Sequence, residues 1–278
     1  MKLFTGSLLL ILFSQAGQAQ FYYKDIVLIR QTADHWKLYR ADKVRSVGLH
    51  SFESDGQPSE GFEGDQEVSG DFTLITTHTK SNRSADSWLM AWYSPVGLPT
   101  RTVDTSDTYR SISEYQYDAS SRLKTIVNTS IETDNKVQAE EQHQWHYDSA
   151  GRPISMWKIK NGSDTTFVRF IPDEKGNIAE EHATRNNTEL PVVYYYYDSD
   201  NRLTDIVRYN ARAQKLLPDY IFDYDTDGRI SGMLMVPEQG SNEYQKWVYV
   251  YNDKGLKTKE SCYNKRKELM GVVEYSYK

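Results

Sequence analysis

Few of the residues with reactive or metal-binding side chains occur at a spacing that predicts a catalytic or metal site. His143 and His146 are three positions apart, and on a strand this spacing puts them on opposite faces, so the two cannot bind one metal ion together. Glu141 and His143 are two apart and would share a face, but ordinary surface polarity explains them better than an acid–base pair does. The sequence contains no G-x-S-x-G nucleophile elbow, no H-E-x-x-H zinc motif and no phosphate-binding loop. We therefore predict no catalytic residue, no metal site and no cofactor.

Two aspartate-rich tetrapeptides, residues 198–201 and 225–228, look like calcium loops. An EF-hand loop needs a glutamate at its twelfth position. Counted from Asp225, that position is Val236, which cannot bind calcium. Turn chemistry explains these aspartates in full. The single cysteine, Cys262, cannot form an internal disulfide, and we expect it to be a half-buried, inert thiol.

Aromatic side chains are better binding candidates than the polar ones. Tyrosine, with 21 copies, is the outlier of the composition. Trp92, Tyr194 and Tyr196 interrupt an otherwise polar strand face, and Trp157 is a lesser candidate. Exposed rings of this kind hold sugars by stacking CH groups on a π face, and we predict a glycan-binding role for these four. The alternative is that the sheet closes on itself and buries them, because aromatic residues usually serve packing.

These residues lie within a phrase that recurs along the chain. It reads aromatic, any residue, Tyr, Asp, two residues, Gly, a basic or polar residue, then an aliphatic one, most clearly in residues 222–230. The positions equivalent to the Asp are 94, 118, 148, 173, 198, 225, 252 and 278. Where a copy has the Asp and the Gly, we expect the Asp side chain to accept bonds from backbone amides two or three residues on, and the Gly to take a left-handed conformation. The phrase therefore predicts tandem hairpins with about 14 to 16 antiparallel strands.

The two faces of these strands differ in composition. Positions one and three before the Asp are aromatic in unit after unit, as in Tyr117 with Tyr115 and Tyr147 with Trp145. Positions two and four before it vary and are mostly polar. Residues on alternate positions share a face, so we expect one repeated, ring-lined face and one variable face.

The phrase resembles the YD repeats of bacterial RHS proteins and of small exported bacterial proteins that carry such hairpins. The resemblance covers roughly residues 89–278 and implies the hairpin geometry. In the large relatives, YD hairpins coil into a hollow β shell around a toxic C-terminal domain, whereas this chain has far fewer units and no toxin domain. The expected fold is an all-β, antiparallel up-and-down meander of tandem β-hairpin repeats. Closed barrel, rolled shell and open twisted sheet all fit, because closure depends on a shear that sequence does not reveal.

The residues before the repeats divide into two predicted segments. Residues 1–19 have the pattern of a secretory signal peptide, with Lys2, a short apolar run and small residues before a cut ahead of Gln20. Residues 20–88 are expected to form an N-terminal β cap on the repeats. Within it, residues 25–29 and 72–76 are predicted strands, and residues 54–70 a long, exposed acidic Gly/Ser loop. No segment shows the 3.6-residue period of a long amphipathic helix.

Charge and hydropathy limit the classes of molecule that the protein is expected to bind. The formal charge of −6 argues against nucleic acid or an anionic membrane. No window resembles a membrane helix, and residues 140–144 are polar on both alternate positions, which argues against a membrane span. We predict a non-catalytic binding or scaffold module in the periplasm or at the cell surface, with a polysaccharide or an envelope protein as its partner. The alternatives are a carbohydrate-active enzyme with dispersed carboxylates and a structural subunit of an envelope assembly.

Overall fold

The computed structural model describes residues 21–82, 84–106, 109–132, 137–236 and 243–278. The predicted signal peptide, residues 1–19, lies outside the described residues. In chain order the elements are α1 (Lys24–Ala41), β1 (Ser46–Glu53), β2 (Glu63–Val68), β3 (Leu74–Ser81), β4 (Ser84–Tyr93), β5 (Pro99–Thr105), β6 (Tyr109–Tyr117), β7 (Leu123–Glu132), β8 (Val137–Tyr147), β9 (Pro153–Lys160), β10 (Asp164–Pro172), β11 (Ile178–Arg185), β12 (Thr188–Glu189), β13 (Val193–Tyr197), β14 (Leu203–Asn210), β15 (Lys215–Tyr224), β16 (Ile230–Met235), β17 (Gln245–Tyr251), β18 (Lys257–Asn264) and β19 (Leu269–Tyr277).

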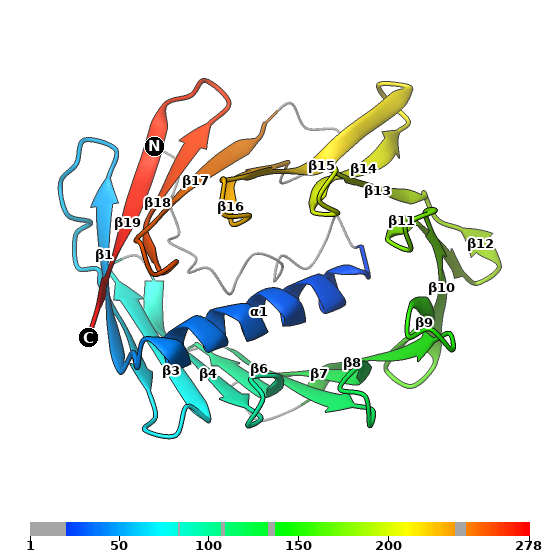
Figure 1. Ribbon diagram of the computed structural model, residues 1–278, viewed down its shortest axis with the longest axis horizontal. Coiled ribbons are helices and arrows are strands. Elements are labelled where there is room, and N and C mark those ends of the chain that lie inside the picture. The colour runs from blue at the N-terminus through cyan, green and yellow to red at the C-terminus, as the bar shows by residue number, and fades with distance from the viewer. Residues whose placement is uncertain (1–20, 83, 107–108, 133–136, 237–242) are drawn as a thin grey trace.

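The strands form one antiparallel meander that closes into a barrel, as Figure 1 shows. Nearly every strand pairs with the one before it and the one after it, and β19 pairs with β1 from Gly271 to Tyr277. The two-residue strand β12 pairs with β11, while β11 also pairs with β13, so 18 strands make the wall. The predicted all-β meander is confirmed, and of the three arrangements left open the closed barrel is the one observed.

The turns that follow the repeated phrase have the predicted geometry. The Asp118 carboxylate accepts bonds from the amides of Ser120 and Arg122, two and four residues on rather than two or three. The backbone bond from Arg122 is the largest cause that lowers the pKa of Asp118. The residue three places after the Asp has a positive φ, 81° at Gly151 and 61° at Ser121, which stands where Gly is missing. Short polar side chains at this position therefore replace glycine in several units.

The tyrosine just before each turn explains why tyrosine, and not phenylalanine, dominates the repeat. The hydroxyl of Tyr147 donates to the carbonyl oxygen of Leu123 in the preceding unit at 2.7 Å, and the guanidinium of Arg122 lies 5.0 Å from the centre of the same ring. The same bond joins Tyr117 to Pro99, Tyr197 to Ile178, Tyr224 to Leu203, Tyr251 to Ile230 and Tyr277 to Lys257. Each such bond contributes about 1 kcal/mol net, and the series joins neighbouring units into one wall.

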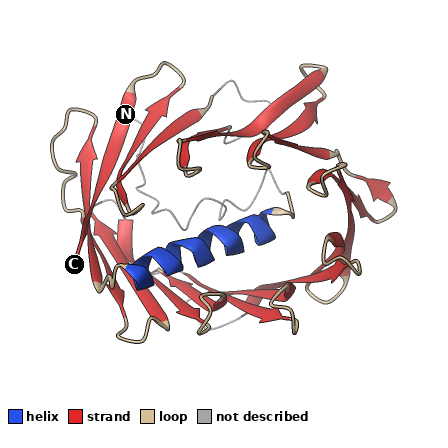
Figure 2. Cartoon of the chain, in the orientation of Figure 1, coloured by secondary structure: helices blue, strands red, loops and turns tan. Residues whose placement is uncertain are grey.

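The core lies between α1 and the inner face of the barrel (Figure 2). The rings three places before the turn Asp are buried there, among them Trp145, Tyr195, Phe222 and Tyr249. Phe21 meets Tyr195 and Tyr220 edge to face, with ring centres 6.1 and 5.6 Å apart. The repeated face of the sequence is therefore the inner face, and the variable face points outward.

The helix corrects one prediction. Residues 25–29 are the first turns of α1, not a strand, and the chain does contain a long helix. Its buried side chains include Ile26, Ile29, Ala33 and Trp36, which follow helical spacing. Val27 and Leu28, between Ile26 and Ile29, are also apolar, so the sequence has a continuous apolar run like that of a buried strand. No described helix combines the length and the apolar character needed to cross a lipid bilayer.

The segment predicted as a cap contributes to the barrel itself. Strands β1, β2 and β3 belong to the same sheet as the repeats, and β4 spans the predicted boundary at residue 88. The predicted loop of residues 54–70 contains β2, so only part of it is a loop. Gln66 and Val68, on one face of β2, are buried, and Gln66 accepts a 2.7 Å hydrogen bond from the Tyr39 hydroxyl of α1.

Candidate surface binding site

The predicted aromatic residues all lie on outward-facing strand positions, but they do not form one site. Trp157 on β9 and Tyr196 on β13 are 40% and 47% exposed, and Tyr194 on β13 is half-buried. Trp92 lies on β4, on another part of the wall, with the Arg101 guanidinium 5.4 Å from its ring centre. The alternative that closure buries these rings is thus wrong for Trp157 and Tyr196.

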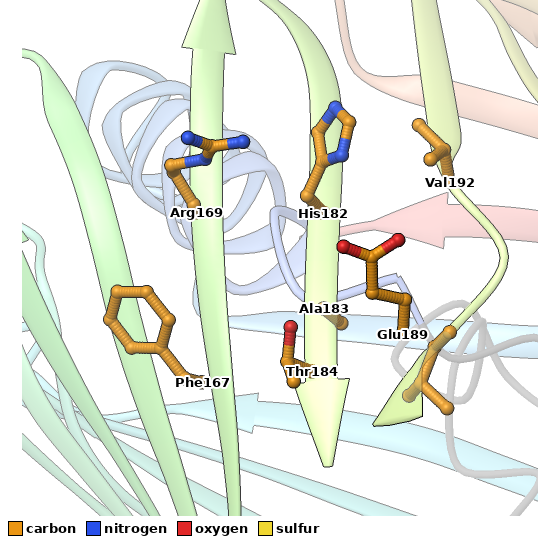
Figure 3. Close-up of a pocket in the computed structure, with 8 residues that line it drawn as sticks. Phe167, Arg169, His182, Ala183, Thr184, Glu189 and Val192 are labelled. Carbon is orange, nitrogen blue, oxygen red and sulfur yellow. The ribbon is translucent and has the colours of Figure 1, made fainter. Parts of the chain in front are cut away.

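A shallow pocket of about 190 Å³ opens on the outer face of the wall, between β10 and the start of β13 (Figure 3). Its lining consists of Phe167, Arg169, His182, Ala183, Thr184, Glu189, Leu190 and Val192. A two-residue turn at Asn186 and Asn187, with φ of 50° and 59°, folds β12 back along β11. After β12 the chain crosses to β13, which pairs with β11 at Glu180 and Glu181. Because β12 is so short, the outer face beside β11 is left uncovered there, and this uncovered area is the pocket.

Polar groups of four kinds line this pocket. Arg169 and His182 are directly opposite each other on β10 and β11. Glu189 lies on β12, opposite Thr184 on β11, and Figure 3 shows its carboxylate on the same side of the sheet as the His182 ring. The His182 Nε2 atom lies 2.6 Å from a carboxylate oxygen of Glu180. The pocket thus offers a guanidinium, an imidazole, a carboxylate and a hydroxyl.

Aromatic rings extend the pocket along the wall. Phe167, at its edge, is directly opposite Trp157 on β9, and the two ring centres are 4.8 Å apart at an interplanar angle of 48°. Trp157 in turn lies opposite Gln144 on β8. Apolar rings beside a few polar groups are the usual make-up of a small-molecule site. Of the four predicted rings, Trp157 contacts Phe167 of the pocket lining, and Tyr194 lies opposite Glu180, the partner of His182. No pattern in the sequence predicted Phe167, Arg169, His182 or Glu189 as site residues.

A second group of polar residues lies inside the barrel and ties α1 to the wall. His143 Nδ1 is 2.6 Å from the Asp25 carboxylate on α1, and His143 Nε2 is 3.0 Å from Glu141. Lys158 Nζ lies 2.8 Å from the other oxygen of Glu141, and Trp145 Nε1 donates to Asp25 at 3.3 Å. Burial would lower the pKa of His143, but the two carboxylates outweigh burial and raise the pKa to about 9.

The reading of Glu141 and His143 as surface polarity is therefore wrong. His143 is 2% exposed, while His146 is exposed on the other face, as its spacing predicted. A usable signal was present, because Trp145 belongs to the repeated, inward-facing positions and residues 143 and 141 share its face. The group is a structural tether, since its charges neutralise one another around a buried imidazolium.

The start of α1 has its own anchor. The Glu181 carboxylate accepts the backbone N–H groups of Tyr22 and Tyr23 at 2.9–3.0 Å and the hydroxyl of Tyr195 at 2.7 Å. A carboxylate at this end of the helix also interacts favourably with the positive end of the helix dipole. Burial nevertheless raises the pKa of Glu181 to about 6, against the effect of these hydrogen bonds. Glu181 thus fixes where the helix enters the barrel.

The remaining candidates do not form reactive sites. Cys262 is fully buried rather than half-buried, and burial raises the pKa of its thiol to about 12. The carboxylate of Asp225, in one of the calcium-like loops, binds the backbone of its own turn and the Arg229 side chain. Among the described residues, no three His, Cys, Asp or Glu side chains are placed to hold a metal ion together.

Comparison with known proteins finds likeness only among solved structures. No family model matches the sequence, and no curated protein matches it. A crystal structure of TcdB2-TccC3-TEV matches with 12% identity and a TM-score of 0.31, over 78% of this chain and 15% of that one. The Photorhabdus luminescens Tc holotoxin pore matches with 11% identity, the same coverage and the same TM-score. A porin-like protein from Bacteroides uniformis matches with 11% identity and a TM-score of 0.38, over 84% of this chain and 98% of that one. This chain therefore spans about 15% of the length of the Tc toxin chains that it is similar to.

Proposed function

We propose that the protein is an exported, non-catalytic binding module of the YD-repeat type, which holds a glycan on the outer face of its barrel in the cell envelope. The observation that carries the proposal is the pocket on β10–β13 with the Trp157–Phe167 ring pair at its edge. Rings of this kind present a flat apolar surface to the CH groups of a sugar, and the polar side chains beside them bind its hydroxyls.

The rest of the molecule supports a rigid presenting surface. The wall is closed, its inner face is packed against α1, and the tyrosine bonds join one unit to the next. A site on strands of this kind is held in place by packing. The variable composition of the outward positions fits a face whose side chains serve recognition, whereas the repeated positions serve the core.

The test is a binding panel of residues 20–278 against bacterial, plant and host polysaccharides, with release of reducing sugar measured in the same wells. Binding without release supports the proposal. Trp157→Ala combined with Phe167→Ala is expected to weaken binding by about fivefold or more, since stacking on an aromatic ring contributes about 0.5–1.5 kcal/mol for each ring. The matched control is Trp88→Ala, because Trp88 is 44% exposed on β4, stacked on His78 at 4.3 Å. Unchanged binding by the double variant would refute the assignment of the site.

A carbohydrate-active enzyme is the second candidate, because Glu189 lines the pocket and Glu180 borders it through His182. Two carboxyl groups beside a sugar are the minimum for glycoside hydrolysis. Release of reducing sugar that Glu189→Gln abolishes would favour this candidate.

If the panel shows neither binding nor release, an envelope protein becomes the favoured partner. The structural-subunit alternative loses the support that an open last strand would give, since β19 pairs with β1.

A further inference from the structure

The charges of the pocket indicate which glycans fit it, and this step rests on the proposed glycan-binding function. Among the residues that the structure describes, the side chains of Arg169 and Glu189 form no hydrogen bond or ion pair, although both residues line the pocket. Other arginines on the surface are engaged, for example Arg185 with Asp164 and Arg229 with Asp225. The pocket therefore keeps one cation and one anion available for a ligand.

A second polar pair at the pocket is already joined by a hydrogen bond. His182 and Glu180 lie 2.6 Å apart, so each side chain has a partner on β11. The charged side chains that line the pocket without a partner are therefore a positive group on β10 and a negative group on β12. The two strands lie on opposite sides of β11, which separates the charges across the pocket.

A ligand with a single charge would meet repulsion at one side of this pocket. A purely acidic sugar is attracted by Arg169 and repelled by Glu189, and a purely basic sugar has the opposite difficulty. A ligand that carries both charges satisfies both groups, and such complementarity determines specificity. The apolar side chains of Phe167, Leu190 and Val192 then contact the uncharged part of the sugar.

We propose that the pocket is specific for a zwitterionic saccharide, an amino sugar with a free ammonium group that also carries a carboxylate. Arg169 binds the carboxylate through its guanidinium, and Glu189 accepts hydrogen bonds from the ammonium group. The sugar ring lies against Phe167, and the next sugar unit of the saccharide extends over Trp157.

Four small probes separate the two charges. Muramic acid carries an amine and a carboxylate, N-acetylmuramic acid lacks the free amine, glucosamine lacks the carboxylate, and N-acetylglucosamine lacks both. Binding is measured by NMR titration near pH 7 on residues 20–278. Muramic acid is expected to bind most tightly, with each charge contributing about a two- to fivefold gain, as exposed ion pairs do.

Variants of the two charged residues assign each gain. Arg169→Gln should remove the advantage that the carboxylate gives and leave that of the amine, and Glu189→Gln should do the reverse. Arg110→Gln, an exposed arginine on β6, is the control and should change neither. Equal binding of muramic acid and N-acetylglucosamine, or equal weakening of all four probes by both variants, would overturn the charge assignment. If the polysaccharide panel shows binding while the four probes show no preference, only this inference fails; if no glycan binds at all, the proposed function fails with it.

Discussion

Replacing His143 with glutamine is expected to lower the stability of the barrel by about 3 kcal/mol near pH 6. The pKa of His143 rises from 6.5 to about 9 in the folded protein because Asp25 and Glu141 flank the ring. A rise of this size corresponds to about 3 kcal/mol of stabilisation by the protonated form. Breaking one partner out of a buried ion pair costs a similar amount, about 3–5 kcal/mol. In thermal unfolding at this chain length the change corresponds to a Tm lower by roughly 6–12 °C.

The dependence on pH follows from the direction of that shift. A group whose pKa is raised on folding stabilises the folded state fully below its unfolded pKa, and loses that effect as the pH rises through its folded pKa. The difference between wild type and the variant should therefore be largest below about pH 6.5 and shrink as the pH approaches about 9. His146→Gln, on the exposed face of the same strand, is the control. A difference in Tm below about 2 °C, or one that does not change with pH, would refute the tether.

Three further outcomes are expected. Tyr224→Phe should lower the free energy of unfolding by about 1 kcal/mol, because it removes the bond to the Leu203 carbonyl; denaturant titration measures this. Gly97→Ala should cost more than 2 kcal/mol by the same measurement, because Gly97 has φ of +85° and an added Cβ would lie 2.3 Å from the Trp36 ring. Cys262 should resist thiol reagents in the native protein and react once it is unfolded, since it is fully buried with a raised pKa; mass spectrometry follows the labelling.

The two substitutions have a matched comparison each. Tyr209→Phe changes a tyrosine that is 49% exposed and should have little effect on the free energy of unfolding. Gly151→Ala keeps a positive φ of +81°, but its added Cβ would meet only the end of the Arg122 side chain at 3.2 Å. It should cost about 1 kcal/mol through the backbone alone. Equal losses for Gly97→Ala and Gly151→Ala would contradict the packing explanation, and rapid labelling of native Cys262 would contradict its burial.

The hairpins could be predicted from the sequence because their causes are local. An Asp that bonds its own turn, and a residue with positive φ three places on, act within six residues. The two faces of the strands were predictable for the same reason, since rings such as Tyr195 and Tyr197 recur on alternate positions. The position of α1 was not predictable in this way, because it depends on distant partners such as Glu181 and His143.

The pocket was beyond sequence reasoning for a related reason. It exists because β12 ends after two residues and the chain returns to β11. The length of the strand that follows the Asn186–Asn187 turn has no local signal in the sequence. Residues such as Arg169 and Glu189 have no motif of their own, and the fold alone brings them to one hollow. Trp157, beside the pocket, was among the predicted residues, because an aromatic side chain can be recognised from the sequence alone.

The pairing of β1 with β19 sets the order in which the chain can fold. Every other pairing in the wall joins strands that are close in sequence, whereas closure joins Val47 to Tyr277, which are 230 positions apart. Closing so long a loop is slow compared with forming hairpins. The helix precedes β1 in the chain and lies inside the barrel. The meander keeps two open edges until β19 pairs with β1. Loss of β19 would leave both edges permanently available to other chains.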